Sequence, residues 1–165
     1  MSDKFKNTKK ESFLKSIPDV SLESDTDLLT LRCKFNFSYM DFNQAAGQHF
    51  SGWDNGQLVK LLDKLYNYSS ESLNYWCNQF INGHSVLSIY KDFPKKSDFE
   101  HPKHVPHQVH WGRFRLENKV RLVGFIIPPE YVEKAHPKTG VRFDGNTFYV
   151  VFLDKEHVFY KTEKP

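Results

Sequence analysis

The stretch HWGRFRLENKVRLVGFII, residues 110–127, decides the fold, because it reads as two β-strands joined by a short polar turn. In both halves arginines alternate with apolar residues, the period-two pattern of a strand with one packed and one polar face. A further strand of this kind, TFYVVFL, follows at 147–153. The segments 110–116, 120–127 and 147–153 therefore predict neighbouring strands with cations along one face of the sheet.

Two helices are predicted on the amino-terminal side of these strands. Leu58, Leu61, Leu62 and Leu65 have the spacing of an amphipathic helix over 57–68, and Asp54 with Gln57 resembles a capping box before it. Ser69-Ser70 can cap a second helix, which we expect to end at Asn82-Gly83.

Alternating apolar residues predict a half-buried strand over 29–42, ahead of the helices. A short strand or a continuation of the core is expected at 85–90. The resulting order, β-α-α-β-β-β, predicts an α+β fold in which a helical hairpin packs on one side of a mostly antiparallel sheet.

Length and composition favour one globular domain over 29–165, preceded by a flexible arm over 1–28 that is polar and rich in lysine and acidic residues. A solvated tail without a role is the alternative for the arm. The net charge of +3 permits a nucleic-acid partner only if the basic residues gather on one face. Cys33 and Cys77 lie far apart, which favours reduced thiols and a cytoplasmic protein over a single disulfide. We expect no membrane partner, because no stretch approaches roughly 18 apolar residues.

Arg113, Arg115 and Arg121 are the candidates for binding a polyanion. Arg113 and Arg115 share a face of one strand, and Arg121 lies on the next. A guanidinium presents a planar fork to phosphate and would stabilise charge on a pentavalent phosphorus. The alternative is that these side chains form surface ion pairs with Glu117 or Glu130, which contribute little to stability.

The residues after the last strand supply candidates for proton transfer. His157 and Tyr160 stand three positions apart, and imidazole is the commonest general acid or base. An exposed histidine and a packed tyrosine are the alternative. Lys119, Lys155 and His110 complete the predicted substrate-binding set.

His101, His104, His107 and His110 recur at every third position. Zinc binding has to be considered, but Pro102 and Pro106 prevent a regular helix and no ligand pair has the usual spacing. We expect a solvated loop, with His107 or His110 at the edge of a substrate groove, and we expect no metal or other cofactor.

Two motifs resemble the RelE/ParE superfamily of toxin–antitoxin toxins, and its HigB branch most closely. The segment NKVRLVGFI at 118–126 is similar to the family's arginine-bearing strand, and 148–152 followed by His157, Tyr160 and Lys161 is similar to its carboxy-terminal pattern. The resemblance implies a β-α-α-β-β-β fold and metal-independent cleavage of messenger RNA, often on the ribosome. It also implies a small antitoxin partner and assigns the catalytic roles to Arg121, His157 and Tyr160. The long arm and the insertion at 128–146 depart from the family pattern.

Two other functions fit the same residues. A non-catalytic module of a phage or mobile element would bind nucleic acid or a protein through Trp111, Phe114 and Tyr149, although such aromatics more often fill a core. A metal-dependent hydrolase would lose its activity to a chelator. Our leading hypothesis is the toxin-like endoribonuclease.

Overall fold

The computed structural model describes residues 8–18, 20–23 and 28–161, and the chain divides into two units, Met1–Thr30 and Leu31–Pro165. The described residues of the first unit include the helix α1 (Thr8–Ser16), none of whose residues is buried. The expected flexible arm falls partly on residues 1–7, 19 and 24–27, which lie outside the described residues.

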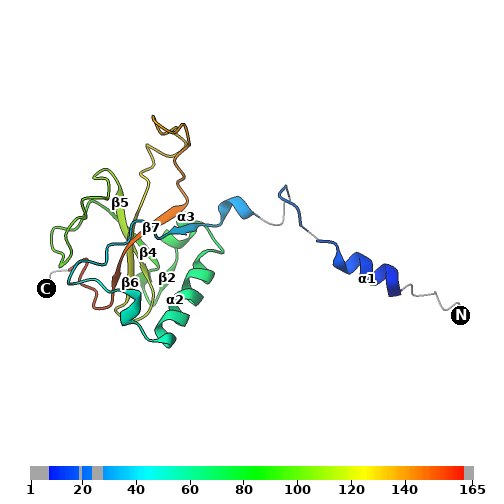
Figure 1. Ribbon diagram of the computed structural model, residues 1–165, viewed down its shortest axis with the longest axis horizontal. Coiled ribbons are helices and arrows are strands. Elements are labelled where there is room, and N and C mark those ends of the chain that lie inside the picture. The colour runs from blue at the N-terminus through cyan, green and yellow to red at the C-terminus, as the bar shows by residue number, and fades with distance from the viewer. Residues whose placement is uncertain (1–7, 19, 24–27, 162–165) are drawn as a thin grey trace, which may run out of the picture. The chain divides into compact units, whose positions relative to one another are not determined.

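The second unit has the predicted α+β fold. Its main sheet has the strand order β1-β7-β6-β5-β4, antiparallel except where β1 runs parallel to β7. Helices α2 and α3 lie on one side of it (Figure 1). The strands of this sheet are β1 (Lys34–Asn36), β4 (Leu87–Lys91), β5 (His110–Arg115), β6 (Arg121–Ile126) and β7 (Thr147–Asp154). The remaining elements are the 3-10 turns η1 (Leu29–Leu31) and η2 (Phe50–Gly52), the helices α2 (Asn55–Tyr68) and α3 (Leu73–Cys77), and the hairpin strands β2 (Phe80–Ile81) and β3 (His84–Ser85).

Helix α2 begins where the sequence predicts. The Asp54 carboxylate accepts a hydrogen bond from the Gln57 N–H at 2.8 Å, and the Gln57 side chain accepts one from the Asp54 N–H at 3.0 Å. This capping box satisfies two backbone donors at the helix start. At the other end of the helix, Tyr68 is buried and stacks on Phe114 of β5 with ring centroids 4.8 Å apart, so the helix is fixed against the sheet.

Two predicted elements are wrong in extent. The strand expected over 29–42 has only three paired residues, because the backbone turns at Ser38, whose N–H donates to the Asn36 side chain. The second helix begins after Ser72 and ends at Cys77. Asn82-Gly83 forms the turn of the β2–β3 hairpin instead, with φ of 51° and 76°. Asn-Gly favours such left-handed turns, which join hairpin strands.

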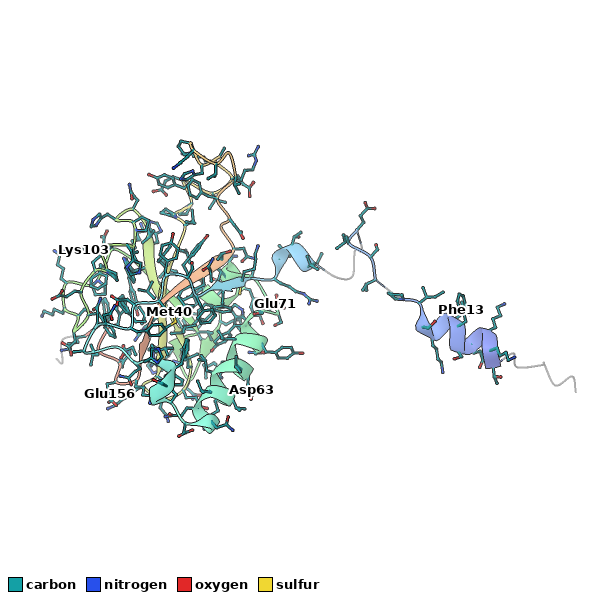
Figure 2. The ribbon with its side chains drawn as sticks, viewed as in Figure 1. Phe13, Met40, Asp63, Glu71, Lys103 and Glu156 are labelled. Atoms are coloured by element: carbon teal, nitrogen blue, oxygen red, sulfur yellow. The ribbon has the colours of Figure 1, made fainter. Side chains whose placement is uncertain are left out.

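The second face of the sheet is covered by loops instead of helices. Phe99 and Phe159 pack against Phe152 and Trp111, and all four rings are buried. Each face of the sheet thus carries its own cluster of buried side chains, drawn as sticks in Figure 2. The insertion at 128–146 extends beyond the ends of β6 and β7 (Figure 1).

The strands β6 and β7 approach each other closely at a bulge. A Cβ at Gly124 would lie 2.1 Å from the Tyr149 carbonyl oxygen, so only glycine fits there. Across the described part of the chain, no helix has the length and apolar character needed to cross a membrane.

Candidate functional site

Strand pairing brings the three predicted arginines to one end of the loop-covered face. Arg115 of β5 lies opposite Arg121 of β6, which in turn lies opposite Asp154 of β7. Arg113 is two residues from Arg115 and therefore shares its face. The three arginines line a cavity of about 180 Å³ together with Ser88 of β4 and Gly83, His84 and Ser85 of the hairpin. We call this the arginine cavity.

The arginine cavity concentrates positive charge. Burial lowers the pKa of Arg113, and burial together with the charges of Arg115 and Arg113 lowers the pKa of Arg121 to about 10. Arg121 Nη1 donates to the carbonyl oxygens of Asn118 at 2.7 Å and Val120 at 2.8 Å. Arg113 Nη1 and Arg115 Nε are buried without a hydrogen-bond partner in the described structure. A bound anion would satisfy these donors.

The alternative of ion pairs with Glu117 or Glu130 does not hold. Glu117 pairs with Lys60 at 3.4 Å. Within the described ranges no carboxylate lies within ion-pair distance of Arg113, Arg115 or Arg121.

A pair of tyrosines borders the arginines. The Arg113 guanidinium lies 5.7 Å from the centroid of the Tyr90 ring, and Tyr160 stacks on Tyr90 at 4.5 Å. Burial lowers the pKa of Arg113, and the nearby Tyr90 hydroxyl offsets part of this shift, yet neither Tyr90 Oη nor Arg113 Nη1 reaches hydrogen-bond geometry with a partner in the described structure. Tyr160 therefore supports Tyr90, which contacts Arg113.

His157 is close enough to the same arginines to feel their charge, although it is not among the residues that line the arginine cavity. Burial, followed by the positive charges of Arg113 and Arg121, lowers the pKa of His157 to about 4. The imidazole is therefore neutral at physiological pH. Its Nε2 is buried and has no hydrogen-bond partner in the described part of the chain.

Asp154 holds the turn that carries His157. Its carboxylate, which is fully buried, accepts hydrogen bonds from the N–H groups of Glu156 at 3.2 Å, Val158 at 3.1 Å and Phe159 at 2.9 Å. His157 itself has φ of 61°, a left-handed conformation that costs energy for a residue other than glycine. Glu156 marks this turn in Figure 2. The buried carboxylate thus fixes the backbone of the turn that carries His157.

The structure does not bring the other predicted site residues to the arginine cavity. His110 pairs with Ile126 and shares the helix-covered face with Phe114, opposite to Arg113. Lys119 is exposed on the turn between β5 and β6. Lys155 Nζ lies 5.1 Å from the centroid of the Trp53 ring and 3.4 Å from Gln57 Oε1, so it faces the start of α2.

Sequence reasoning missed His84, Ser88, Tyr90 and Asp154. Ser88 and Tyr90 lie in the segment 85–90, which was expected to be a short strand or a continuation of the core. Only its pairing with β5, which places Ser88 opposite Arg113, shows that this segment borders the cavity. His84 follows the dipeptide that was interpreted as a helix end. An aspartate directly after an apolar strand was the available signal for Asp154.

The histidine row gathers no metal-binding set. The rings of His101 and His107 stack at 4.7 Å, and His104 Nε2 lies 2.9 Å from the Tyr39 carbonyl oxygen. The described residues include no cluster of three or more His, Cys, Asp or Glu side chains that could hold a metal ion. Cys33 and Cys77 are free thiols, and burial raises the pKa of both.

Comparison with known proteins finds no family model, no curated protein and no solved structure that matches this chain significantly. The resemblance to the RelE/ParE superfamily therefore stays a prediction.

Proposed function

We propose that this protein is a toxin-like endoribonuclease that cleaves messenger RNA at the arginine cavity without a metal ion. One observation carries the proposal: three arginines from two strands converge on one cavity, two of them have buried N–H groups without a partner, and a neutral imidazole lies beside them. Such an arrangement suits a phosphodiester, which would supply the missing acceptors and counter-charge. Along the chain, the main-sheet strands and the helices α2 and α3 follow the order β-α-α-β-β-β-β, which has one strand (β4) more than the fold that the RelE/ParE resemblance implies.

The cleavage proceeds by attack of the ribose 2′-oxygen on the adjacent phosphorus. His157 removes the 2′-hydroxyl proton, the new P–O bond closes a 2′,3′-cyclic phosphate, and the bond to the 5′-oxygen breaks. The arginines stabilise the charge on the equatorial oxygens. Entry of the phosphate adds negative charge beside Arg113 and Arg121, which raises the basicity of His157 at the moment when it must accept a proton.

His84 is the candidate acid for the leaving 5′-oxygen. It lines the arginine cavity from the β2–β3 hairpin, and it is exposed. Solvent can therefore return the proton that His84 gives up. Tyr90 and Tyr160 position Arg113, so in this mechanism Tyr160 acts through its neighbours instead of through the substrate.

The test is cleavage of a long messenger RNA by the purified protein, with a chelator present throughout. His157→Gln should lower the rate by about 10²- to 10⁴-fold with an unchanged melting curve. His136→Gln, at a half-buried histidine on the insertion that does not line the arginine cavity, is the matched control and should cleave normally. Full activity of His157→Gln would refute the assignment. RNA that is bound but not cut would favour the non-catalytic binding module.

The partners follow from the same proposal. RNA is the substrate, on the ribosome or free, in the cytoplasm. A small antitoxin protein is the expected inhibitor, and co-expression with a neighbouring small open reading frame should restore growth to cells that the protein arrests.

A further inference from the structure

A second cavity lies on the other side of the turn between β5 and β6. It has a volume of about 250 Å³, and its polar lining includes Lys60, Lys64, Lys155, Gln57, Glu117 and the indole of Trp53. Three lysines surround one carboxylate here, and Glu117 already pairs with Lys60 at 3.4 Å. Asp63 lies in the shallower hollow next to it, with Lys60 and Lys64. The second cavity therefore keeps an excess of positive charge.

Trp53 supplies the observation that points to a ligand. Its side chain is only 8% exposed, and its Nε1–H is buried without a hydrogen-bond partner in the described structure. An indole N–H can only donate, and a buried one usually finds an acceptor. Lys155 does not compete for this role, because it is also a donor. Trp53 thus adds an unused donor to a cavity lined by three ammonium groups and one carboxylate, Glu117, which already pairs with Lys60.

The two cavities share one turn. Arg115 lines the arginine cavity, and the next residue, Leu116, lines the second one. Arg121 lines the arginine cavity and donates a hydrogen bond to the carbonyl oxygen of Asn118, and Asn118 itself lines the second cavity. The exposed Lys119 stands on the turn itself. An extended polyanion that crosses this turn would therefore place successive anionic groups at both cavities.

We propose that the second cavity is a phosphate-binding subsite for the RNA strand whose scissile phosphate lies in the arginine cavity. The identity of the strand rests on the proposed function, whereas the anion subsite rests on Trp53 and the lysines alone. With this subsite, the affinity of the protein for RNA depends on the length of the strand. A short fragment fills only the arginine cavity, whereas a longer strand fills both cavities.

Binding of 2′-O-methyl RNA tests this subsite, because such a strand has no free 2′-hydroxyl and cannot be cleaved. We would measure the affinity of the full chain for a dinucleotide and for a strand of roughly eight nucleotides, as a function of salt. The double variant Lys64→Gln/Lys155→Gln should weaken binding of the longer strand about tenfold and reduce its salt slope by about one to two. Its affinity for the dinucleotide should not change.

Two further variants sharpen the test. Trp53→Phe keeps an aromatic ring but removes the donor, and should weaken binding of the longer strand about fivefold. Lys103→Gln, at an exposed lysine on the loop-covered side (Figure 2), removes one positive charge far from the turn in sequence and should change neither strand's affinity.

The outcomes separate the two proposals. Equal affinities and salt slopes for the double variant and Lys103→Gln would overturn the subsite, while Arg113→Gln could still abolish binding and support the arginine cavity. A lysine-dependent salt slope without RNA cleavage would support the subsite and overturn the nuclease. Lysine-dependent binding of polyglutamate, with RNA left unbound, would assign the cavity to an acidic protein and overturn the RNA subsite.

Discussion

Replacing Asp154 with asparagine should destabilise the protein more than any comparable change at a surface carboxylate. The Asp154 side chain is fully buried and accepts three backbone hydrogen bonds, two at Oδ1 and one at Oδ2. Asparagine has the same shape, but its amide NH₂ would replace one oxygen. The amide NH₂ would then face either the N–H groups of Glu156 and Val158 or the N–H group of Phe159, and a donor would meet a donor.

The cost can be worked out from these contacts. One charge-assisted hydrogen bond is worth about 1.5–3 kcal/mol, and a buried donor left without a partner costs a further 1–3 kcal/mol. The substitution also removes the carboxylate that favours the charged forms of Arg113 and Arg121. We therefore expect Asp154→Asn to lower the free energy of unfolding by about 3 kcal/mol, the sum of one lost charge-assisted bond and one unpartnered buried donor.

Urea denaturation at neutral pH measures this loss directly. Asp98→Asn is the matched control, because Asp98 is an exposed carboxylate that pairs with Lys161, and its loss should cost less than about 1 kcal/mol. A loss below about 1 kcal/mol for Asp154→Asn would show that the 154–159 turn does not depend on this carboxylate, and would refute the reasoning that fixes His157.

Three more predictions follow from the same contacts. Because the pKa of His157 falls from 6.5 to about 4 on folding, the unfolded chain is protonated first as the pH drops. The free energy of unfolding should thus decline between these values, and His157→Gln should remove on the order of 1 kcal/mol of that decline in urea titrations, after allowance for solvent screening. Arg115→Gln should raise the free energy of unfolding by about 0.5–1 kcal/mol at low salt, because the charge of Arg115 adds to burial in lowering the pKa of Arg121. The gain in stability should vanish at high salt, and a gain that is independent of salt would contradict this cause. Gly124→Ala should cost roughly 1–3 kcal/mol in thermal melts, whereas Gly52→Ala, whose Cβ would meet nothing within 4 Å, should not; equal effects would show that the bulge can relax.

The parts of the fold that were predicted correctly are those in which the sequence pattern agrees with the burial of side chains, or in which a local motif alone sets the structure. The segments that became β5, β6 and β7 alternate because one face packs on helices and the other carries arginines and aromatics, so pattern and burial agree. The start of α2 was predictable because a capping box is a local device. Asn82-Gly83 misled because the same dipeptide can end a helix or turn a hairpin, and only the pairing of Phe80 with Ser85 decides between them.

The candidate site could be predicted from the sequence only where the alternation of side chains along a single strand decides which residues share a face. Arg113 and Arg115 share a face by the period-two rule, and the structure places them there. The contribution of β4 and of the hairpin depends on strand order and register, which a single sequence does not contain. For the same reason Lys155 was grouped with His157, although the chain reverses between them and Lys155 faces α2.

The arrangement of charges at the arginine cavity argues for an external anion. A buried cluster of like charges raises the energy of the folded state unless something compensates it. Asp154, the buried carboxylate opposite Arg121 in the sheet, directs its oxygens to backbone N–H groups and lies outside ion-pair distance of the described arginines. Packing alone does not require arginine at positions 113 and 121, because apolar residues there would extend the buried cluster that contains Trp111, Val123 and Phe152. The protein therefore keeps a costly cationic cavity that the carboxylates of the described residues leave unpaired, and such a cost is best explained by a ligand that brings the opposite charge.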